Sequence, residues 1–291
     1  MLNGVVVKAY NSYYYVQDKD KVISCKLRGR FKKGRFSLMV GDEVNYMIVG
    51  QDSGIIEEIL PRRGLLKRPA VANVDQVVLT FAAANPDINT TLVDKLLVLA
   101  EDAQLDIIVC INKIDLANDD EIAPLAELYQ RVGYSVMFTS AKSGMGIEKL
   151  RNALYGKITA FAGPSGAGKS SLLNTIEAGL QLVTGEVSAK IGRGKHTTRF
   201  AELLPLSGGG FVVDTPGFSA TEFTDIDFIN LTYCFPEMAA LASSCKFSTC
   251  LHDREPQCAV KQAVLEGKIA QTRYASYKDV LDELRANKKG Y

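Results

Sequence analysis

The hydrophobic pattern of the first 67 residues is that of short strands separated by turns. Valine, isoleucine and tyrosine dominate brief runs, and aspartate and glycine interrupt them, as β-rich sequences do. Five such runs within about sixty residues predict a small closed barrel of the OB-fold kind. The predicted strands are Gly4–Tyr10, Ser12–Gln17, Val22–Leu27, Glu43–Val49 and Gly54–Leu60.

From residue 68 onward, apolar runs alternate with helical stretches. This alternation predicts a parallel sheet with crossover helices, whose buried strands read as near-continuous apolar runs. The predicted strands are Asp75–Phe81, Leu105–Ile111, Tyr134–Phe138, Ile158–Ala162 and Gly210–Val213. The predicted helices are Thr91–Asp102, 120–131 and Gly146–Leu154.

The pattern changes again near residue 223, and residues 259–286 read as helical with a break near Gly267. We therefore predict three domains. They are an OB-fold barrel over 1–67, an α/β P-loop domain over 68–222 and a mainly helical domain over 223–291.

Composition adds a charge asymmetry that the net charge of +1 hides. Residues 1–68 hold 13 Lys/Arg and 7 Asp/Glu, a net charge of +6, so the other residues sum to −5. A basic end on a near-neutral chain indicates a polyanion partner for the barrel. Five of the eight residues in Arg28–Arg35 are basic, and with Phe31 available for stacking this loop is a candidate grip on RNA. A solvated basic loop is the alternative.

The chain lacks the sequence signs of membrane insertion or secretion. No apolar run approaches the ~18 residues of a membrane span, and the N-terminus has no basic region followed by a long apolar run. We expect a cytoplasmic protein without a membrane partner, acting as a monomer.

Residues 163–170 match the phosphate-binding pattern G-x-x-x-x-G-K-S between a predicted strand and a helical run. The glycines let successive N–H groups point at phosphate oxygens, and the helix N-terminus adds partial positive charge. Lys169 is expected to reach the β- and γ-phosphates and Ser170 to ligate Mg²⁺. A glycine-rich turn that binds nothing is the alternative. The candidate residues are Gly163, Pro164, Ser165, Gly166, Ala167, Gly168, Lys169, Ser170 and Ser171.

A second motif follows the strand predicted to end at Ile111 and suits recognition of guanine. The Asp115 carboxylate can accept both N–H groups on the N1 and N2 edge of guanine. Adenine would present a lone pair at N1 to that carboxylate, an unpaired polar contact that discriminates strongly. Lys113 is expected to lie along the base and Asn112 to tie loops together. The motif consists of Asn112, Lys113, Ile114 and Asp115.

Two more motifs follow apolar runs. A backbone N–H within Ser140, Ala141 and Lys142 is expected to face guanine O6. Asp214 is expected to hold Mg²⁺ through a water, and the N–H of Gly217 to contact a γ-phosphate. Because the carboxyl ends of parallel strands share one rim of a sheet, all four motifs are expected to meet there.

Four soft or borderline metal ligands lie within fourteen residues of the C-terminal domain, in the pattern C-x₄-C-x-H-x₅-C. Three thiolates and one imidazole suit a tetrahedral structural zinc site, and we expect one Zn²⁺ per chain. Buried free cysteines or a disulfide are the alternatives. The candidate ligands are Cys245, Cys250, His252 and Cys258.

Together these motifs resemble the TRAFAC GTPases, and more narrowly their circularly permuted members. The phosphate loop ordinarily comes first, whereas here Asn112–Asp115 and Ser140–Lys142 precede Gly163–Ser170, and Asp214–Gly217 comes last. With the basic barrel and the Cys/His pattern, the whole chain is similar to the RsgA-type GTPases. This resemblance implies a GTP hydrolase that binds the small (30S) ribosomal subunit and its rRNA, acts in late maturation, and is stimulated by the subunit. It implies GTP/GDP, Mg²⁺ and Zn²⁺ as cofactors.

The resemblance also assigns roles around residues 180–200, which we interpret as switch I. It places the Mg²⁺-ligating threonine at Thr198, with Thr197 as the alternative. Phe218 stands where Ras-like enzymes have a glutamine that orients the attacking water, so intrinsic hydrolysis should be slow. His196 is the local candidate for orienting the attacking water. Lys169 and Thr198 are the other candidate catalytic residues. His196 could instead contact RNA or solvent, and the ribosome could supply the group.

Three other functions remain compatible with the sequence. One is a nucleotide-gated RNA-binding module with incidental hydrolysis, which Phe218 keeps open. Another is a P-loop ATPase or kinase, against which Asp115 argues. The third is a translation factor that acts on the assembled ribosome. Only the family resemblance distinguishes this function from a role in subunit maturation.

Two expectations concern the C-terminal domain. Because 27 residues separate Gly217 from Cys245, nucleotide state could move this domain through a short connection. The last helical stretch could present a second RNA-facing surface, with a solvated charged helix as the equal alternative. The residues of that surface are Arg273, Tyr274, Tyr277, Lys278, Arg285, Lys288 and Lys289.

Overall fold

The computed structural model of the chain describes residues 1–29, 37–67, 69–180, 182, 201–213 and 226–288. The chain divides into two compact units. One holds residues 1–77, 148–161 and 173–218, and the other holds residues 78–147, 162–172 and 219–291. Each unit contains part of the α/β domain predicted over 68–222, and the predicted domain boundaries remain predictions.

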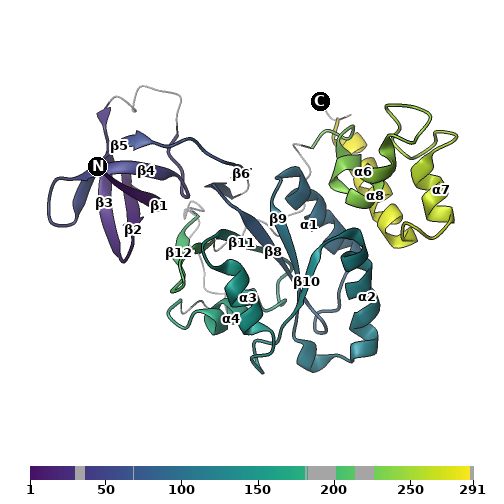
Figure 1. Cartoon of the computed structure of the whole chain (residues 1–291), viewed down its shortest axis with the longest axis horizontal. Helices are drawn as coiled ribbons and strands as arrows, with labels where there is room; N and C mark the ends of the chain where they lie inside the picture. The colour runs from purple at the N-terminus through teal and green to yellow at the C-terminus, as the bar shows by residue number, and fades with distance from the viewer. Residues whose placement is uncertain (30–36, 68, 181, 183–200, 214–225, 289–291) are drawn as a thin grey trace. The chain divides into compact units, whose positions relative to one another are not determined.

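The first five strands form a closed barrel in the order β1-β2-β3-β5-β4 (Figure 1). β3 pairs with β5 in parallel, and the other neighbouring pairs are antiparallel. Residues such as Val6, Val16 and Ile23 build the core, because alternate side chains of a strand face one side. The predicted barrel is confirmed, with every boundary within two residues: β1 Leu2–Tyr10, β2 Tyr13–Asp18, β3 Lys21–Leu27, β4 Glu43–Ile48 and β5 Ser53–Ile59.

A six-stranded sheet carries the α/β part, in the order β10-β9-β8-β11-β13-β12. β9 pairs with β10 and β11 pairs with β13 in parallel, as predicted, whereas the short β12 runs antiparallel to β13. All residues of β8 and β11 are buried, which explains their largely apolar sequence. The strands are β8 Gln76–Ala82, β9 Asp106–Asn112, β10 Ser135–Phe138, β11 Ile158–Ala162, β12 Leu203–Pro205 and β13 Phe211–Val213.

Helices alternate with these strands, and their ends carry recognisable caps. The side chain of Asn89 accepts a hydrogen bond from the N–H of Leu92 at 3.1 Å and starts the first helix. Gly133, with φ of 111°, ends the second in the left-handed conformation that favours glycine. The helices are α1 Thr90–Asp102, α2 Asp119–Val132, α3 Ile147–Leu154 and α4 Lys169–Ile176.

Several short elements were not predicted from the sequence. β6 Leu65–Lys67 and β7 Ala70–Ala72 form a two-stranded sheet. A 3₁₀ turn, η2, spans Ile114–Leu116, directly after β9. Such three-residue pieces are too short to show a period of hydrophobicity, so they follow from neighbouring structure instead.

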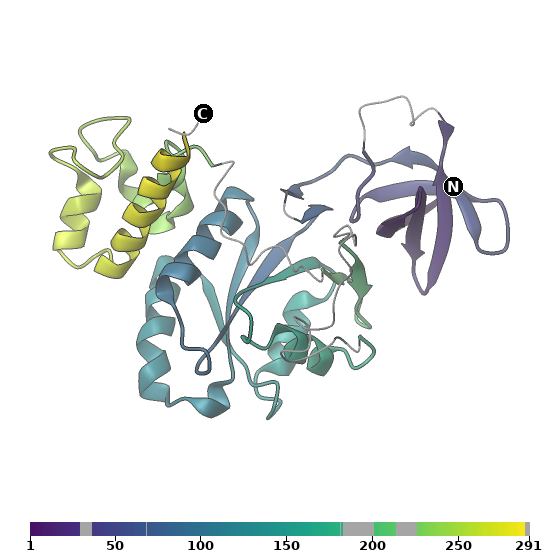
Figure 2. The same cartoon turned by 180° about the vertical axis from the view of Figure 1, so that it is seen from behind.

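Residues 226–288, here called the C-terminal segment, consist of helices and loops (Figure 2). A buried cluster that includes Leu231, Phe235 and Tyr277 forms its core. Gly267, with φ of 70°, lies between the last two helices, where the break was predicted. Its elements are η3 Leu231–Cys234, α6 Pro236–Ala242, α7 Ala259–Leu265 and α8 Gln271–Lys288.

The predicted RNA-facing surface of the last helix is wrong at two of its residues. Arg273 is 1% exposed and Tyr277 is fully buried, so neither can present its side chain to a partner. Lys278 and Arg285 both donate to Asp253, within the same segment. The described helices include none that is both long and apolar enough to cross a membrane.

Candidate functional site

Gly163 places the phosphate-binding loop tightly against the sheet. It follows β11 directly, has φ of 133°, and a Cβ added there would lie 2.0 Å from the carbonyl oxygen of Thr80 on β8. Real Cβ atoms do not approach backbone so closely, and this φ is strained for any residue with a side chain. Glycine is therefore required at the first position of the motif.

Asn112, at the end of β9, joins three loops. Its Nδ2 donates to the carbonyl oxygen of Ala167 at 2.9 Å, and its Oδ1 accepts from the Thr139 hydroxyl and the Ala141 N–H, both at 3.3 Å. The side chain is 1% exposed. A Cβ on Gly168 would come within 2.4 Å of Asn112 Nδ2, so a glycine is needed on that side as well. The phosphate loop and both guanine motifs therefore meet at one side chain.

Asp115 is exposed at the same rim, where a base could reach it. The Ser140 hydroxyl donates to Asp115 Oδ1 at 2.6 Å and accepts from the Ser143 N–H at 3.1 Å. These two hydrogen bonds hold the carboxylate in one orientation. Lys113 adopts the left-handed conformation, with φ of 60°, and its Nζ donates to the carbonyl oxygen of Asn85.

Lys169 begins α4 and directs its ammonium group back into the loop. Nζ donates to the carbonyl oxygens of Gly163 at 2.7 Å and Pro164 at 2.9 Å. A cation, a helix N-terminus and a loop whose glycines Gly163 and Gly168 have φ of 133° and 90° together suit the phosphates of a nucleotide. Ser165 and Gly166 are exposed at the loop, while Ser170 and Ser171 are half-buried at the start of the helix.

Phe218, Lys289 and residues 30–35 of the basic loop, Phe31 among them, lie outside the part of the chain that the structure describes. So do five predicted nucleotide-site residues in switch I and in the motif after β13. Their assigned contacts with Mg²⁺, water and the γ-phosphate remain predictions. These residues are His196, Thr197, Thr198, Asp214 and Gly217.

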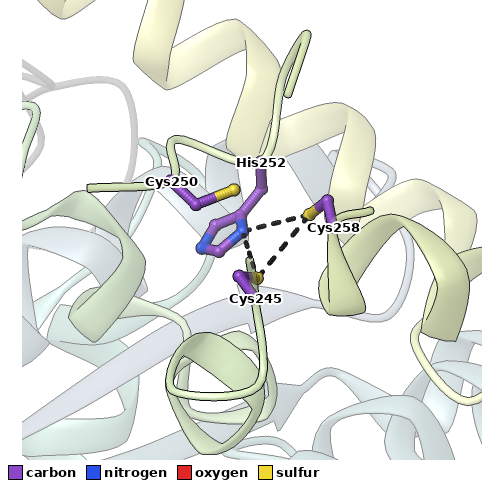
Figure 3. Close-up of side chains that lie close together, drawn as sticks. All are labelled: Cys245, Cys250, His252 and Cys258. Carbon is purple, nitrogen blue, oxygen red and sulfur yellow. Dashed lines mark hydrogen bonds between the residues drawn. The ribbon is translucent and has the colours of Figure 1, made fainter. Parts of the chain in front are cut away.

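The four predicted zinc ligands come together in the C-terminal segment (Figure 3). Their ligand atoms all lie within 4.8 Å of one another. His252 Nδ1 is 3.3 Å from Cys258 Sγ and 3.6 Å from Cys245 Sγ, and the two sulfur atoms are 3.9 Å apart. Zinc bonds of about 2.3 Å to sulfur and 2.0 Å to nitrogen give tetrahedral edges of roughly 3.8 Å and 3.6 Å. The cluster of Cys245, Cys250, His252 and Cys258, here called the Cys₃His cluster, therefore fits one zinc ion.

The pKa shifts in the cluster favour metal binding at the histidine and oppose it at the cysteines. Burial lowers the pKa of His252, which favours the neutral imidazole that binds metals. Burial raises the pKa of Cys250 to about 12, so its thiol must release a proton when it binds a metal. Burial also raises the pKa of Cys258, and the Lys261 N–H, which donates to Cys258 Sγ at 3.5 Å at the start of α7, offsets this only in part.

The ligand loop is supported by α8 and by one carboxylate. The hydroxyls of Tyr274 and Tyr277 donate to the carbonyl oxygens of His252 and Leu251, at 2.7 and 2.9 Å. Glu255 accepts from the Leu251 N–H at 3.0 Å. Outer contacts of this kind orient metal ligands, and they were not predicted from the sequence.

Comparison with known protein families shows which family has this combination of sites. The RsgA N-terminal domain model matches residues 3–56, and the RsgA GTPase model matches residues 59–224. The chain belongs to the RsgA GTPase family. Within RsgA, a protein from Caldanaerobacter subterraneus subsp. tengcongensis described as small ribosomal subunit biogenesis GTPase RsgA is 45% identical over 99% of this chain and 97% of its own length. A protein from Listeria innocua described as RsgA 2 is 44% identical over the full length of both chains.

Solved structures of RsgA relatives agree over the same extent. The crystal structure of YjeQ from Thermotoga maritima is 42% identical, covers 97% of this chain and 98% of its own, and has a TM-score of 0.86. The structure of YloQ, described as a circularly permuted GTPase, is 41% identical, covers 98% and 96%, and has a TM-score of 0.83. The barrel, the permuted GTPase sheet and the C-terminal Cys₃His segment are thus the RsgA architecture, and the family interpretation from the motif order is confirmed.

The nucleotide loops of this RsgA chain include residues that sequence reasoning missed. Asn85 receives the Lys113 ammonium, and Pro86 Cδ lies 3.3 Å from where a Cβ on Gly166 would stand. The dipeptide Asn-Pro is a turn signal, which could have marked this loop after β8 as structured. Thr139 supports Asn112, but a lone threonine after a strand carries no recognisable signal.

Proposed function

We propose that this chain hydrolyses GTP to GDP and phosphate in the late maturation of the small ribosomal subunit, and that binding of the subunit stimulates hydrolysis. The observation that carries the proposal is the joint at Asn112, where loops from three parts of the sequence meet in a guanine-nucleotide arrangement. The full-length relatives described as small ribosomal subunit biogenesis GTPases support the biological context.

In this proposal the nucleotide is held by Gly163–Ser171, Asn112–Asp115 and Ser140–Lys142. Lys169 balances the charge of the β- and γ-phosphates, and Asp115 accepts the guanine N–H groups. Mg²⁺, which would neutralise charge on the phosphates, is held by Ser170 and by Thr198 of switch I. The close packing of Gly163 on Thr80 and of Gly168 on Asn112, which only glycine permits at these positive φ angles, supports the phosphate part.

The reaction also needs a residue that orients the attacking water. Phe218 has no group that can hydrogen-bond a water, so the chain needs another residue to orient the nucleophile. We assign this role to His196, in switch I. Contact of the subunit with switch I would then raise the rate of hydrolysis.

RNA contacts are assigned to the barrel. Its segment carries the net charge of +6 over residues 1–68, and Arg28 opens the basic loop between β3 and β4. The Cys₃His cluster is assigned one structural zinc, because four ligands fill a tetrahedral coordination sphere and leave no open catalytic position.

The central test is steady-state hydrolysis of GTP with and without purified small ribosomal subunits, with large subunits and with ATP as controls. We expect strong stimulation by small subunits alone and no turnover of ATP. Tight GTP-dependent binding to the subunit without stimulation would instead favour the nucleotide-gated RNA-binding module.

Base recognition is tested separately by Asp115→Asn. An amide in place of the carboxylate can no longer accept two N–H groups, so GTP affinity should fall and xanthosine triphosphate should become the preferred nucleotide. The measurement is competition binding with both nucleotides. Unchanged preference for GTP would remove Asp115 from the assigned role.

A further inference from the structure

Arg273 is a buried arginine that the proposed reaction does not use. It lies on α8, and its side chain is 1% exposed. Nη1 donates to Asp94 Oδ1 on α1 at 2.7 Å. Nε and Nη2 donate to the two carboxylate oxygens of Glu237 on α6, at 2.7 and 3.2 Å. One guanidinium thus joins a helix of the GTPase sheet to the C-terminal segment.

Aromatic rings enclose this ion cluster. The guanidinium carbon of Arg273 lies 4.6 Å from the ring centroid of Phe235 and 6.0 Å from that of Tyr129 on α2. The Tyr129 hydroxyl donates to Asp94 Oδ1 at 3.0 Å. Burial alone would lower the pKa of Arg273, but its two carboxylate partners raise it above its usual value, so the charge is retained. A charge in such surroundings cannot be left without its partners, because water does not replace them.

The same two helices share further contacts. Val98 of α1 belongs to the buried cluster that contains Leu231, Phe235 and Tyr277 of the C-terminal segment. At the edge of this contact, Lys95 Nζ donates to Glu283 Oε2 at 2.7 Å. Three kinds of contact therefore hold α1 and α8 together: buried apolar side chains, the paired Arg273 and the ion pair at the edge.

The other end of α1 reaches the guanine-binding loops. The helix starts at its N-cap Asn89, three residues beyond Pro86, and Asn85 receives the Lys113 ammonium. A displacement of α1 would therefore disturb both the base-binding motif and the C-terminal segment.

We propose that Arg273 is an interdomain latch, which fixes the C-terminal segment to α1 so that both move as one body in every nucleotide state. The latch opposes the expectation that nucleotide state swings the C-terminal domain through the short connection after Gly217. A swing would separate Arg273 from Asp94, whereas the latch presents the Cys₃His cluster at a constant position relative to the guanine-binding loops.

The test measures the distance between two spin labels in the full-length, zinc-loaded chain. Labels attached through a keto amino acid at Glu127 on α2 and Leu265 on α7, both exposed, avoid the native cysteines. Pulsed electron paramagnetic resonance is recorded without nucleotide, with GDP and with a non-hydrolysable GTP analogue. The latch predicts one narrow distribution with the same centre in all three. A centre that moves with the nucleotide by more than the width of the distribution overturns the proposal.

Variants then assign the effect to Arg273. Arg273→Met should broaden the distribution, and Arg273→Lys should broaden it less, because one ammonium keeps the charge but cannot span both carboxylates. Arg285→Met is the matched control, since Arg285 lies on the same helix but pairs with Asp253 inside the C-terminal segment. The distribution of this control should stay narrow, and equal broadening in the control would overturn the assignment.

Asp94→Asn keeps the shape of the side chain and removes its charge, so it serves if Arg273→Met fails to fold. It should broaden the distribution as well, and a narrow distribution would count against the latch. The nucleotide-free measurement needs no GTP binding or hydrolysis. A failure of the proposed reaction would therefore leave this test intact.

Discussion

The two candidate sites of the chain differ in the atoms that hold them together. The nucleotide loops are fixed by contacts with main-chain atoms: Gly163 packs on the Thr80 carbonyl, and the Asn112 side chain bonds the Ala167 carbonyl and the Ala141 N–H. The Cys₃His cluster is made of side-chain atoms, whose sulfur and nitrogen atoms lie 3.3 to 3.9 Å apart.

The difference lies in what each site needs from its ligand. Strands and glycines position the nucleotide loops, so their shape exists independently of a bound phosphate. The Cys₃His cluster buries thiols and an imidazole whose attraction for one another is weak, so a metal has to supply the binding energy that holds the loop. The first site should lose affinity in steps as its contacts are removed, and the second should fail when any one ligand is lost.

The largest effect is expected from Cys250→Ala, because loss of one ligand removes most of the zinc-binding free energy, about 10 kcal/mol or more for a structural site. The C-terminal segment should lose its protection from amide hydrogen exchange, and the zinc content should fall toward zero. Cys234→Ala is the matched control, since Cys234 is also buried in this segment but lies outside the cluster. A chain that keeps full protection without zinc would contradict the comparison.

Gly163→Ala should nearly abolish nucleotide binding. A Cβ 2.0 Å from the Thr80 carbonyl oxygen, at φ of 133°, forces the loop or β8 to move. We expect GTP affinity to fall on the order of 100-fold or more, measured by calorimetry. Gly179→Ala, where a Cβ would meet nothing within 4 Å, should bind normally.

Asn112→Ala should have an intermediate effect, because it leaves the buried Ala167 carbonyl and the half-buried Ala141 N–H without their partner. Such losses cost about 1–3 kcal/mol, which corresponds to roughly a 5- to 150-fold weaker affinity for GTP. Thermal stability should change less than affinity if the strands position the loops. Loss of the fold, without a separate loss of affinity, would show that Asn112 acts as a core residue instead.

Ser140→Ala should give the smallest effect. It removes the hydroxyl that orients Asp115, but Asp115 is exposed and water can replace the hydrogen bond. We expect a roughly threefold to tenfold weaker affinity for GDP, with the preference for guanine retained. A change of base preference would mean that Ser140 reads the base directly.

The sequence predicted the barrel and the motif positions well, for reasons that differ between them. Barrel strands such as β2 and β3 are short runs rich in valine, isoleucine and tyrosine between turn residues, so each is visible within its own stretch of sequence. The loops after β9 and β11 carry residues whose chemistry is specific at fixed spacing. In both cases the information is local.

The errors arise where structure depends on distant partners. Arg273 looked like an exposed residue on a charged helix, but Asp94, 179 positions away, pairs with it and allows it to be buried. No periodicity along α8 contains that partner. β12 Leu203–Pro205 is likewise defined by its pairing with β13 and by nothing in its own three residues. The roles of His196 and Thr198 remain predictions.

The strand order of the sheet has a consequence for how the chain is made. Among the strands of this sheet, β8, β9 and β10 leave the ribosome first, and β11, the partner on the other side of β8, begins more than seventy residues after β8 ends. Until then, β8 is an unpaired edge of a half-sheet whose residues are all destined for burial, and such edges invite pairing with other chains. Permutation therefore makes the newborn guanine-recognition half dependent on the timely arrival of its own phosphate-binding strand, so a translational pause between β10 and β11 should promote misassembly.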